Sequence, residues 1–289
     1  MNRRDLLLGA VALSLGCVRR RNAITIGSKN FTEQLVLGEL LAQYLDARSI
    51  PIERRFYLAG SYVCHQALLA GRIDLYVEYT GTALAAILKQ PPMQDHDRVY
   101  RLVEEEYARR FGLAVFPSLG FDNSFAMVIR GDDARRLQLR SISDAAKYAP
   151  QWRIGVGYEF LEREDGYAGL ARTYGLQFAE VPRVMDLGLL YRALESKQVD
   201  MIAASNTDGL IAALSLVALE DDRHYFPPYD AVPIVGRKAL ERFPAVADEL
   251  KRLAGRITAE QMRQLNYAID GEHKDVREVV RSFLGAQAF

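Results

Sequence analysis

Short β-branched segments alternate with helical segments along most of this chain. The first such unit spans residues 24–44, where the strand pattern ITI stops at Gly27. Leucines at helical spacing follow, and they predict a helix that starts near Asn30 and buries one face. The succession of strands and helices repeats from residue 51 to residue 235, and it predicts an α/β fold with largely parallel sheets.

The loop before the first helix carries a lysine, Lys29. Asn30 and Glu33, three residues apart, have the spacing of a capping box at the start of the helix. A helix N-terminus directs free backbone N–H groups at one point, where negatively charged ligand groups collect, and Lys29 adds a positive charge there. An ordinary βα turn with a solvated lysine is the alternative that these residues alone leave open.

The charges of the chain are balanced. Of its 289 residues, 37 are Lys or Arg and 37 are Asp or Glu, so no basic field indicates a nucleic-acid partner. The length allows one large or two medium domains, each with ample core.

The N-terminus has the order of an export signal. Residues 1–17 contain Arg3 and Arg4, then an apolar run too short to span a bilayer, then small residues before Cys17. This ending resembles a bacterial lipobox, and the paired arginines also resemble a twin-arginine signal. We therefore predict an exported protein, periplasmic or at the cell surface, that is anchored to a membrane through lipidated Cys17. A buried N-terminal helix is the alternative.

Two parts of the chain resemble each other. Residues 67–81 and 193–207 each contain a helix, a tight turn and a strand that ends in small polar residues. Two such units suit two lobes whose strand ends face each other across a cleft, where α/β proteins bind ligands. Tyr79 and Ser205 then occupy matching positions at the cleft.

Signals of enzyme chemistry are weak. Cys64 and His65 are neighbours on a predicted helix and do not face each other, so a nucleophile–base pair is not indicated. The four histidines show no metal-ligand spacing, and no phosphate-binding glycine motif is present, so we expect no metal and no cofactor. Tyr79, Phe125 and Tyr229 lie at predicted element ends, where they either pack in a core or form an aromatic box for a quaternary ammonium.

Six segments in order along the chain resemble one family. They are IGSKNFTEQ at 26–34, IDLYVEYTGT at 73–82, GFDNSFAM at 120–127, EFLEREDGYAGL at 159–170, NTDGLI at 206–211 and YFPPYDAVPIV at 225–235. Together they resemble the substrate-binding proteins of ABC importers for osmoprotectants such as glycine betaine, choline and carnitine. The resemblance implies a two-lobed periplasmic-binding-protein fold of type II with the ligand cleft between the lobes. Residues 1–17 would be the signal peptide, 23–122 plus 227–289 lobe 1, and 123–226 lobe 2.

The resemblance also implies the ligand-binding residues. Lys29, Thr82 and Arg163 resemble the groups that hold a ligand carboxylate, and Tyr79 and Tyr229 resemble two cage tyrosines. Three further positions depart from the family pattern: Phe125 stands where a third tyrosine is common, Asn123 where an acidic residue occurs, and Ser205 where some members have a fourth tyrosine.

The function implied is that of a non-enzymatic binding protein, which we expect to be a monomer. It would close on a small quaternary amine or betaine, through a hinge at residues 121–128 and 229–235, and deliver it to an ABC permease. The three departures from the family pattern leave open a bulkier or aromatic betaine as the ligand. The rival functions are a ligand sensor and a periplasmic enzyme that uses Arg163, Glu164 and Asp165.

Overall fold

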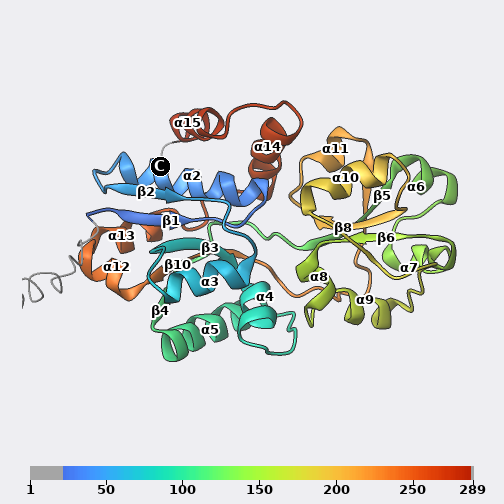
Figure 1. Cartoon of the computed structure of the whole chain (residues 1–289), viewed down its shortest axis with the longest axis horizontal. Helices are drawn as coiled ribbons and strands as arrows, with labels where there is room; N and C mark the ends of the chain where they lie inside the picture. Colours follow the sequence, from blue (N-terminus) through green and yellow to red (C-terminus); the bar gives the residue numbers. More distant parts are fainter. Residues whose placement is uncertain (1–21, 288–289) are drawn as a thin grey trace, which may run out of the picture.

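The computed structural model describes residues 22–287 of the 289-residue chain. Cys17 and the apolar run before it, where we predict a lipoprotein signal peptide, lie outside the described residues. The described part forms two lobes that lie side by side, each built on a five-stranded sheet (Figure 1). Within residues 22–287, none of the helices has both the length and the apolar character needed to cross a membrane.

Lobe 1 combines the first four strands of the chain with the last one. Its sheet has the strand order β2-β1-β3-β10-β4. The strands are β1 (Ile24–Gly27), β2 (Ile52–Arg55), β3 (Leu75–Tyr79), β4 (Leu113–Val115) and β10 (Ala231–Gly236). The helices are α2 (Thr32–Asp46), α3 (Ser61–Leu69), α4 (Thr80–Thr82), α5 (His96–Glu106), α12 (Arg237–Arg242), α13 (Ala245–Arg252), α14 (Ala259–Asp270) and α15 (Val276–Ala286).

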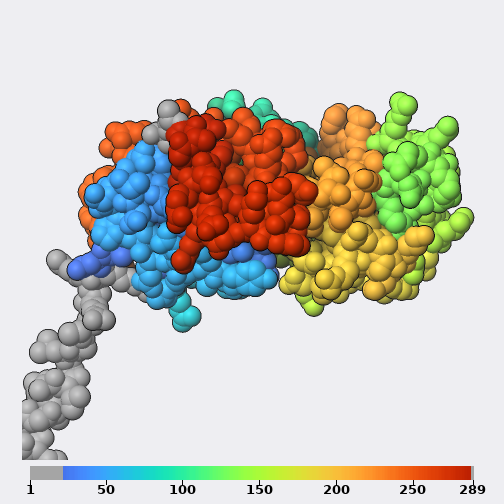
Figure 2. Space-filling model, turned by 90° about the horizontal axis from the view of Figure 1, so that it is seen from above, coloured from blue at the N-terminus to red at the C-terminus, as the bar shows by residue number. Residues whose placement is uncertain are grey.

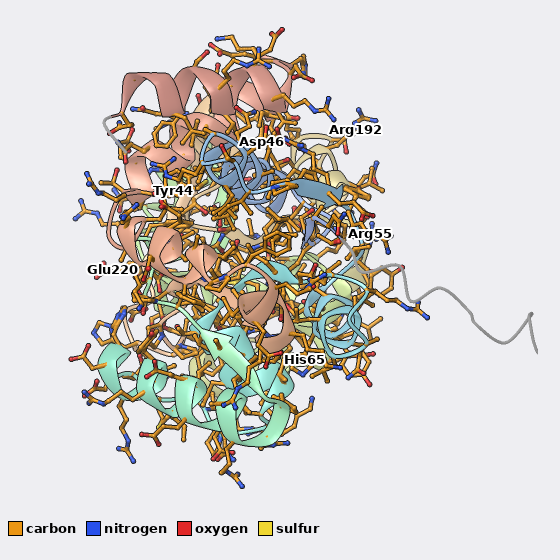
Figure 3. The ribbon with its side chains drawn as sticks, turned by 90° about the vertical axis from the view of Figure 1, so that its left-hand side faces the viewer. Tyr44, Asp46, Arg55, His65, Arg192 and Glu220 are labelled. Carbon is orange, nitrogen blue, oxygen red and sulfur yellow. The ribbon has the colours of Figure 1, made fainter. Side chains whose placement is uncertain are left out.

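Helices cover both faces of this sheet, and β3 shows why. All five residues of β3 are buried, as expected of a strand with no solvent-exposed face. Leu75 and Val77 belong to the same apolar cluster as the buried face of α2, whereas Tyr76 belongs to the cluster beneath α3 and α5. In the end-on view of Figure 3, Tyr44 on α2 accordingly lies in the upper part of the lobe and His65 on α3 in the lower part.

Lobe 2 is built from the middle of the chain. Its sheet has the order β7-β6-β8-β5-β9. The strands are β5 (Phe125–Arg130), β6 (Ile154–Val156), β7 (Arg183–Val184), β8 (Met201–Ser205) and β9 (Leu216–Leu219). The helices are α6 (Gly131–Leu137), α7 (Ile142–Ala145), α8 (Tyr158–Glu162), α9 (Tyr167–Tyr174), α10 (Leu187–Glu195) and α11 (Leu210–Ala213).

Both sheets are mixed: the prediction of largely parallel sheets holds for four of the five strands in each sheet, and one crossing strand in each runs the other way. In lobe 1, β10 runs antiparallel to β3 and β4, and in lobe 2, β5 runs antiparallel to β8 and β9. The register explains the orientation, because Ala231 at the start of β10 pairs with Tyr79 at the end of β3. Phe125 at the start of β5 likewise pairs with Ser205 at the end of β8. Each crossing strand enters its sheet from the junction between the lobes, where the neighbouring strand ends, and it must therefore run in the opposite direction.

The two crossing segments are hydrogen-bonded to each other between the lobes. The N–H of Asn123 donates to the carbonyl of Tyr229 at 3.0 Å, and the N–H of Ala231 donates to the carbonyl of Phe121 at 3.1 Å. Asp122 and Asp230 form an isolated antiparallel bridge between these contacts. The hinge motion and the lobe boundaries after residues 122 and 226 stay predictions.

The repeating pattern of the sequence predicts strands at residues 177–181 and 121–130, and both differ from the structure. The predicted strand at 177–181 does not form, and the edge strand of lobe 2 is β7, which starts at Arg183. Val181 is 83% exposed and Pro182 has no N–H to donate, so this segment has neither a buried face nor a complete ladder. The predicted strand at 121–130 begins only at Phe125, since the Asp122 carboxylate accepts the N–H of Ser124 and turns the chain there.

Candidate functional site

The ends of β3 and β8 meet between the lobes through the side chain of Asn123. The Asn123 Nδ2 donates to the hydroxyl of Tyr79 at 3.3 Å, and its Oδ1 accepts from the hydroxyl of Ser205 at 2.6 Å. Three of the predicted site residues, from two lobes and a crossing segment, are thus joined. The matching cleft positions expected for Tyr79 and Ser205 lie on this chain of contacts.

The carboxylate of Glu33 is the centre of this group, and the sequence analysis did not assign it there. It accepts hydrogen bonds from the Tyr79 hydroxyl at 2.5 Å, from Asn123 Nδ2, from the Thr207 hydroxyl and from Asn266 Nδ2 at 3.2 Å. Glu33 belongs to α2 of lobe 1 and Thr207 to lobe 2, so the carboxylate connects the lobes. Burial raises the pKa of Glu33, and the hydrogen bonds from its four neighbours offset part of that rise.

The predicted capping box is wrong, and its failure explains the role of Glu33. The residue before the first turn of α2 is Phe31, which makes no side-chain cap, so Asn30 lies one residue too early. Glu33 is therefore in the second helical position, and its carboxylate points to the neighbouring lobe rather than to the backbone of its own helix. The sequence does contain one signal for this role of Glu33, namely a glutamate in the first turn of a helix that closely follows a strand end.

Lys29 lies beside Tyr79, but its charge is already paired. Its ammonium group forms a buried ion pair with the carboxylate of Glu78 and lies 4.4 Å from the centroid of the Tyr79 ring. The Glu78 carboxylate also accepts the N–H of Tyr79 at 2.8 Å and the hydroxyl of Ser61 at 3.4 Å. The predicted carboxylate-binding lysine thus has a protein carboxylate as its partner.

A second group of contacts, around Arg163, also crosses between the lobes. The Arg163 guanidinium pairs with both oxygens of Asp165 and donates from Nη1 to the hydroxyl of Thr82 in lobe 1 at 3.0 Å. The hydroxyl of Tyr229 donates to Asp165 Oδ2 at 2.6 Å. Burial alone would lower the pKa of Arg163, but the adjacent Asp165 carboxylate outweighs it and the net pKa is raised.

Aromatic rings surround this second group. The rings of Phe125 and Tyr229 meet edge to face, with centroids 5.5 Å apart, and the Arg163 guanidinium carbon lies 5.1 Å and 5.6 Å from their centroids. Phe160 and Phe226 also pack against Phe125. The Tyr79 ring instead stacks near Phe31 with centroids 6.4 Å apart. The structure therefore sorts the predicted residues into a Glu33 group and an Arg163 group.

Side chains that could ligate a metal come together at one place in residues 22–287. His96, Asp122 and Asp230 each offer an atom within 4.8 Å of the others, and His96 Nδ1 lies 2.8 Å from Asp230 Oδ2. Spacing along the chain did not reveal this group because its members come from distant segments. Asp122 already accepts the N–H groups of Tyr229 and Ser124, so its carboxylate holds the crossing segments together.

A comparison with known protein families establishes the family of this chain. The family described as "OpuAC: Substrate binding domain of ABC-type glycine betaine transport system" matches residues 22–286. The chain belongs to this family. The resemblance noted in the sequence is confirmed, and so is the two-lobed binding-protein architecture.

Relatives within the substrate-binding family have names that differ in the ligand. The chain is 33% identical over 270 residues to the "Ergothioneine transport permease/ergothioneine binding protein EgtU" of Helicobacter pylori, covering 91% of this chain and 48% of that protein. It therefore spans about half the length of that relative. It is 32% identical over 267 residues to the "Carnitine transport binding protein OpuCC" of Listeria monocytogenes, covering 91% of this chain and 86% of that protein.

A solved structure of the same architecture supports the family assignment. Its title is "Crystal structure of glycine betaine/carnitine/choline ABC transporter", and it matches with a TM-score of 0.76 and 30% sequence identity. The match covers 91% of this chain and 98% of that one. Proteins of the substrate-binding family bind solutes for transport, which agrees with the weak catalytic signals in the sequence.

Proposed function

We propose that this protein is an extracytoplasmic solute-binding protein that closes its two lobes on a small quaternary-ammonium compound and presents it to an ABC permease. One observation carries the proposal: two buried groups of polar contacts cross between the lobes, and each includes a tyrosine, Tyr79 at the end of β3 and Tyr229 shortly before β10. Tyr79 is 4% exposed and Tyr229 is 1% exposed, so both rings are available only between or beneath the lobes. Desolvated rings attract a quaternary ammonium through cation–π contacts.

The ligand-binding set that we propose is Lys29, Tyr79, Thr82, Asn123, Phe125, Arg163, Ser205 and Tyr229, together with Glu33 and Thr207. The relatives' names support a betaine-type ligand, because carnitine, ergothioneine and glycine betaine each contain a quaternary ammonium. The name of the Helicobacter pylori relative combines a permease with a binding protein, which supports a permease as the partner. We further propose that the protein does no covalent chemistry, acts as a monomer and is anchored through Cys17.

Calorimetric titration of the purified protein with glycine betaine, carnitine, choline and ergothioneine tests this function. We expect saturable binding of at least one of them with one site per chain. The ligand should be recovered chemically unchanged after incubation, which a mass-spectrometric comparison before and after checks. Tyr79→Ala should weaken that binding by removing one ring, worth about 0.5–2 kcal/mol when desolvated. Absence of binding by all four compounds would contradict the proposed function.

A further inference from the structure

Helix α3 of lobe 1 follows a residue that cannot cap it. This residue is Gly60, which has no side chain to accept a hydrogen bond from the first turn. The first N–H groups of a helix have no partner within the helix and carry a partial positive charge, so an acceptor there stabilises the helix. The acceptor comes from lobe 2, because the N–H of Ser61 donates to Glu159 Oε1 at 2.7 Å.

The absence of a side chain at Gly60 is what lets Glu159 approach. A Cβ at position 60 would lie 2.0 Å from Glu159 Oε1 and 2.6 Å from Glu159 Cδ, and its three nearest atoms would all belong to Glu159. The backbone of Gly60 is extended, a conformation that other residues also adopt. The carboxylate of the other lobe, and not the backbone, is therefore what restricts the size of this residue.

Glu159 lies close to the predicted ligand-binding residues but is not one of them. Its carbonyl accepts the N–H of Arg163 at 3.1 Å, and the hydroxyl of Ser61 reaches Glu78 Oε1, the partner of Lys29, at 3.4 Å. Figure 1 shows α8, which carries Glu159, on the side of lobe 2 that faces lobe 1. Glu159 itself is exposed, so water can take its place at α3 when the lobes separate. The contact therefore favours the closed arrangement without being needed to fold either lobe.

We propose that Glu159 is a positioning residue for ligand binding, whose carboxylate caps α3 across the lobes and holds the closed conformation. The inference rests on the proposed function, in which the lobes close on a ligand, and it adds a residue that the ligand does not touch. A cap that forms only when the lobes meet raises the population of the closed state. The apparent affinity for every ligand should then rise by one common factor.

The test measures affinity and dissociation rate for glycine betaine, carnitine, choline and ergothioneine in the wild type and three variants. Glu159→Ala should weaken every compound that binds by the same factor, about three- to tenfold, through faster dissociation. Glu159→Gln keeps an acceptor oxygen without the charge, so it should lose less. Glu162→Ala is the matched control and should equal the wild type, because Glu162 is exposed on the same helix and, among residues 22–287, makes no hydrogen bond or ion pair with lobe 1.

Gly60→Ala tests the same contact from lobe 1. The new methyl group must displace the Glu159 carboxylate, so this variant alone should weaken binding about as much as Glu159→Ala. In a Glu159→Ala background the same methyl group has no carboxylate to displace, so it should change the affinity little. Losses that add in the double variant would overturn the inference, and so would a loss in Glu159→Ala that differs from one ligand to another.

Small-angle scattering without ligand separates a failure of this inference from a failure of the proposed function. If none of the four compounds binds the wild type, the proposed function fails, and the radius of gyration then decides the role of Glu159. A larger radius for Glu159→Ala than for both the wild type and Glu162→Ala would support a cap that holds the lobes together. Equal radii for the three proteins would overturn it.

Discussion

The hydroxyl of Thr207 in lobe 2 donates to the carboxylate of Glu33 in lobe 1, and this bond joins the two lobes. Thr207 is fully buried, and Gly209, two residues later, packs against Tyr267 of α14. In Figure 2, the red surface of α14 and α15 accordingly adjoins the orange and yellow surface of lobe 2. The described conformation is therefore one in which the lobes are in contact.

Thr207→Val should weaken this contact while keeping the side-chain shape. Hydrogen bonds to charged groups contribute about 1.5–3 kcal/mol, so we expect ligand affinity to fall by about tenfold or more. Calorimetry measures the affinity, and small-angle scattering measures any increase in the radius of gyration. Thr173→Val is the control, because the carbonyl of Thr173 and not its hydroxyl accepts the bond from Arg223. Equal affinities for Thr207→Val and the wild type would show that this bond does not support closure.

Gly209→Ala should act as a wedge between the lobes. An added Cβ at Gly209 would lie 2.5 Å from both the Cβ and the backbone nitrogen of Tyr267 on α14, so the lobes must separate to admit it. We expect a larger radius of gyration and weaker ligand binding with little loss of unfolding free energy. Gly285→Ala, where no heavy atom lies within 4 Å of the new Cβ, should leave both measurements unchanged. A compact Gly209→Ala variant with wild-type affinity would contradict this reading of the interface.

Arg163→Ala and Asp165→Ala should each lower the unfolding free energy strongly, and the two losses should not add in the double variant. Removing one partner leaves the other charge buried and unpaired, since Asp165 is 0% exposed and Arg163 is 9% exposed. Each single variant should lose about 3–5 kcal/mol of unfolding free energy, and the double variant should lose clearly less than the two losses added. Urea denaturation of the four proteins measures this coupling. The exposed pair Arg135 and Asp132 should show coupling below about 1 kcal/mol, and additive losses at Arg163 and Asp165 would refute the pairing.

The stability of the protein should depend on pH through Asp208. Burial raises its pKa to about 6, and the charges of Glu33 and Asp270 add to this, while hydrogen bonds from Tyr191 and Ser205 oppose it. A raised folded-state pKa means that the folded state holds the proton more tightly, so this residue costs stability as the pH rises from about 4 to about 6. The cost is about 3 kcal/mol at most for a shift of this size.

Asp208→Asn should remove that part of the pH dependence. The difference in unfolding free energy between variant and wild type should grow in favour of the variant from about pH 4 to about pH 6, because only the wild type has a proton to lose there. Urea denaturation at several pH values measures it. Asp248→Asn, with a side chain that is 73% exposed, serves as the control. Parallel pH curves for Asp208→Asn and the wild type would exclude the raised pKa.

Cys17→Ala tests the proposed anchor. The acyl chains of a lipidated cysteine would supply the attachment to the membrane, so the variant should be released into the soluble extracytoplasmic fraction with its ligand binding intact. Fractionation after washing with high salt, followed by calorimetry on the released protein, measures both. Retention of the variant in the membrane fraction would contradict a lipid anchor at this residue.

The sequence alone determined most of the succession of strands and helices and the likeness to the family. The period of the apolar residues marked the start of α2 to within about two residues, because that helix buries one face. The internal similarity placed Tyr79 and Ser205 at corresponding strand ends, and the family segments indicated the fold. These features depend on local spacing or on motifs, which a single chain displays directly.

Tertiary structure alone decided the direction of the crossing strands and the partner of each buried charge. The antiparallel orientation of β5 and β10 follows from where the chain passes between the lobes, which no local period records. Lys29 meets Glu78 across 49 positions of the chain, and Glu33 meets Thr207 across 174. A side chain's charge and hydrogen-bonding capacity are encoded locally, but whether a counter-charge reaches it depends on which distant segments the fold brings into contact.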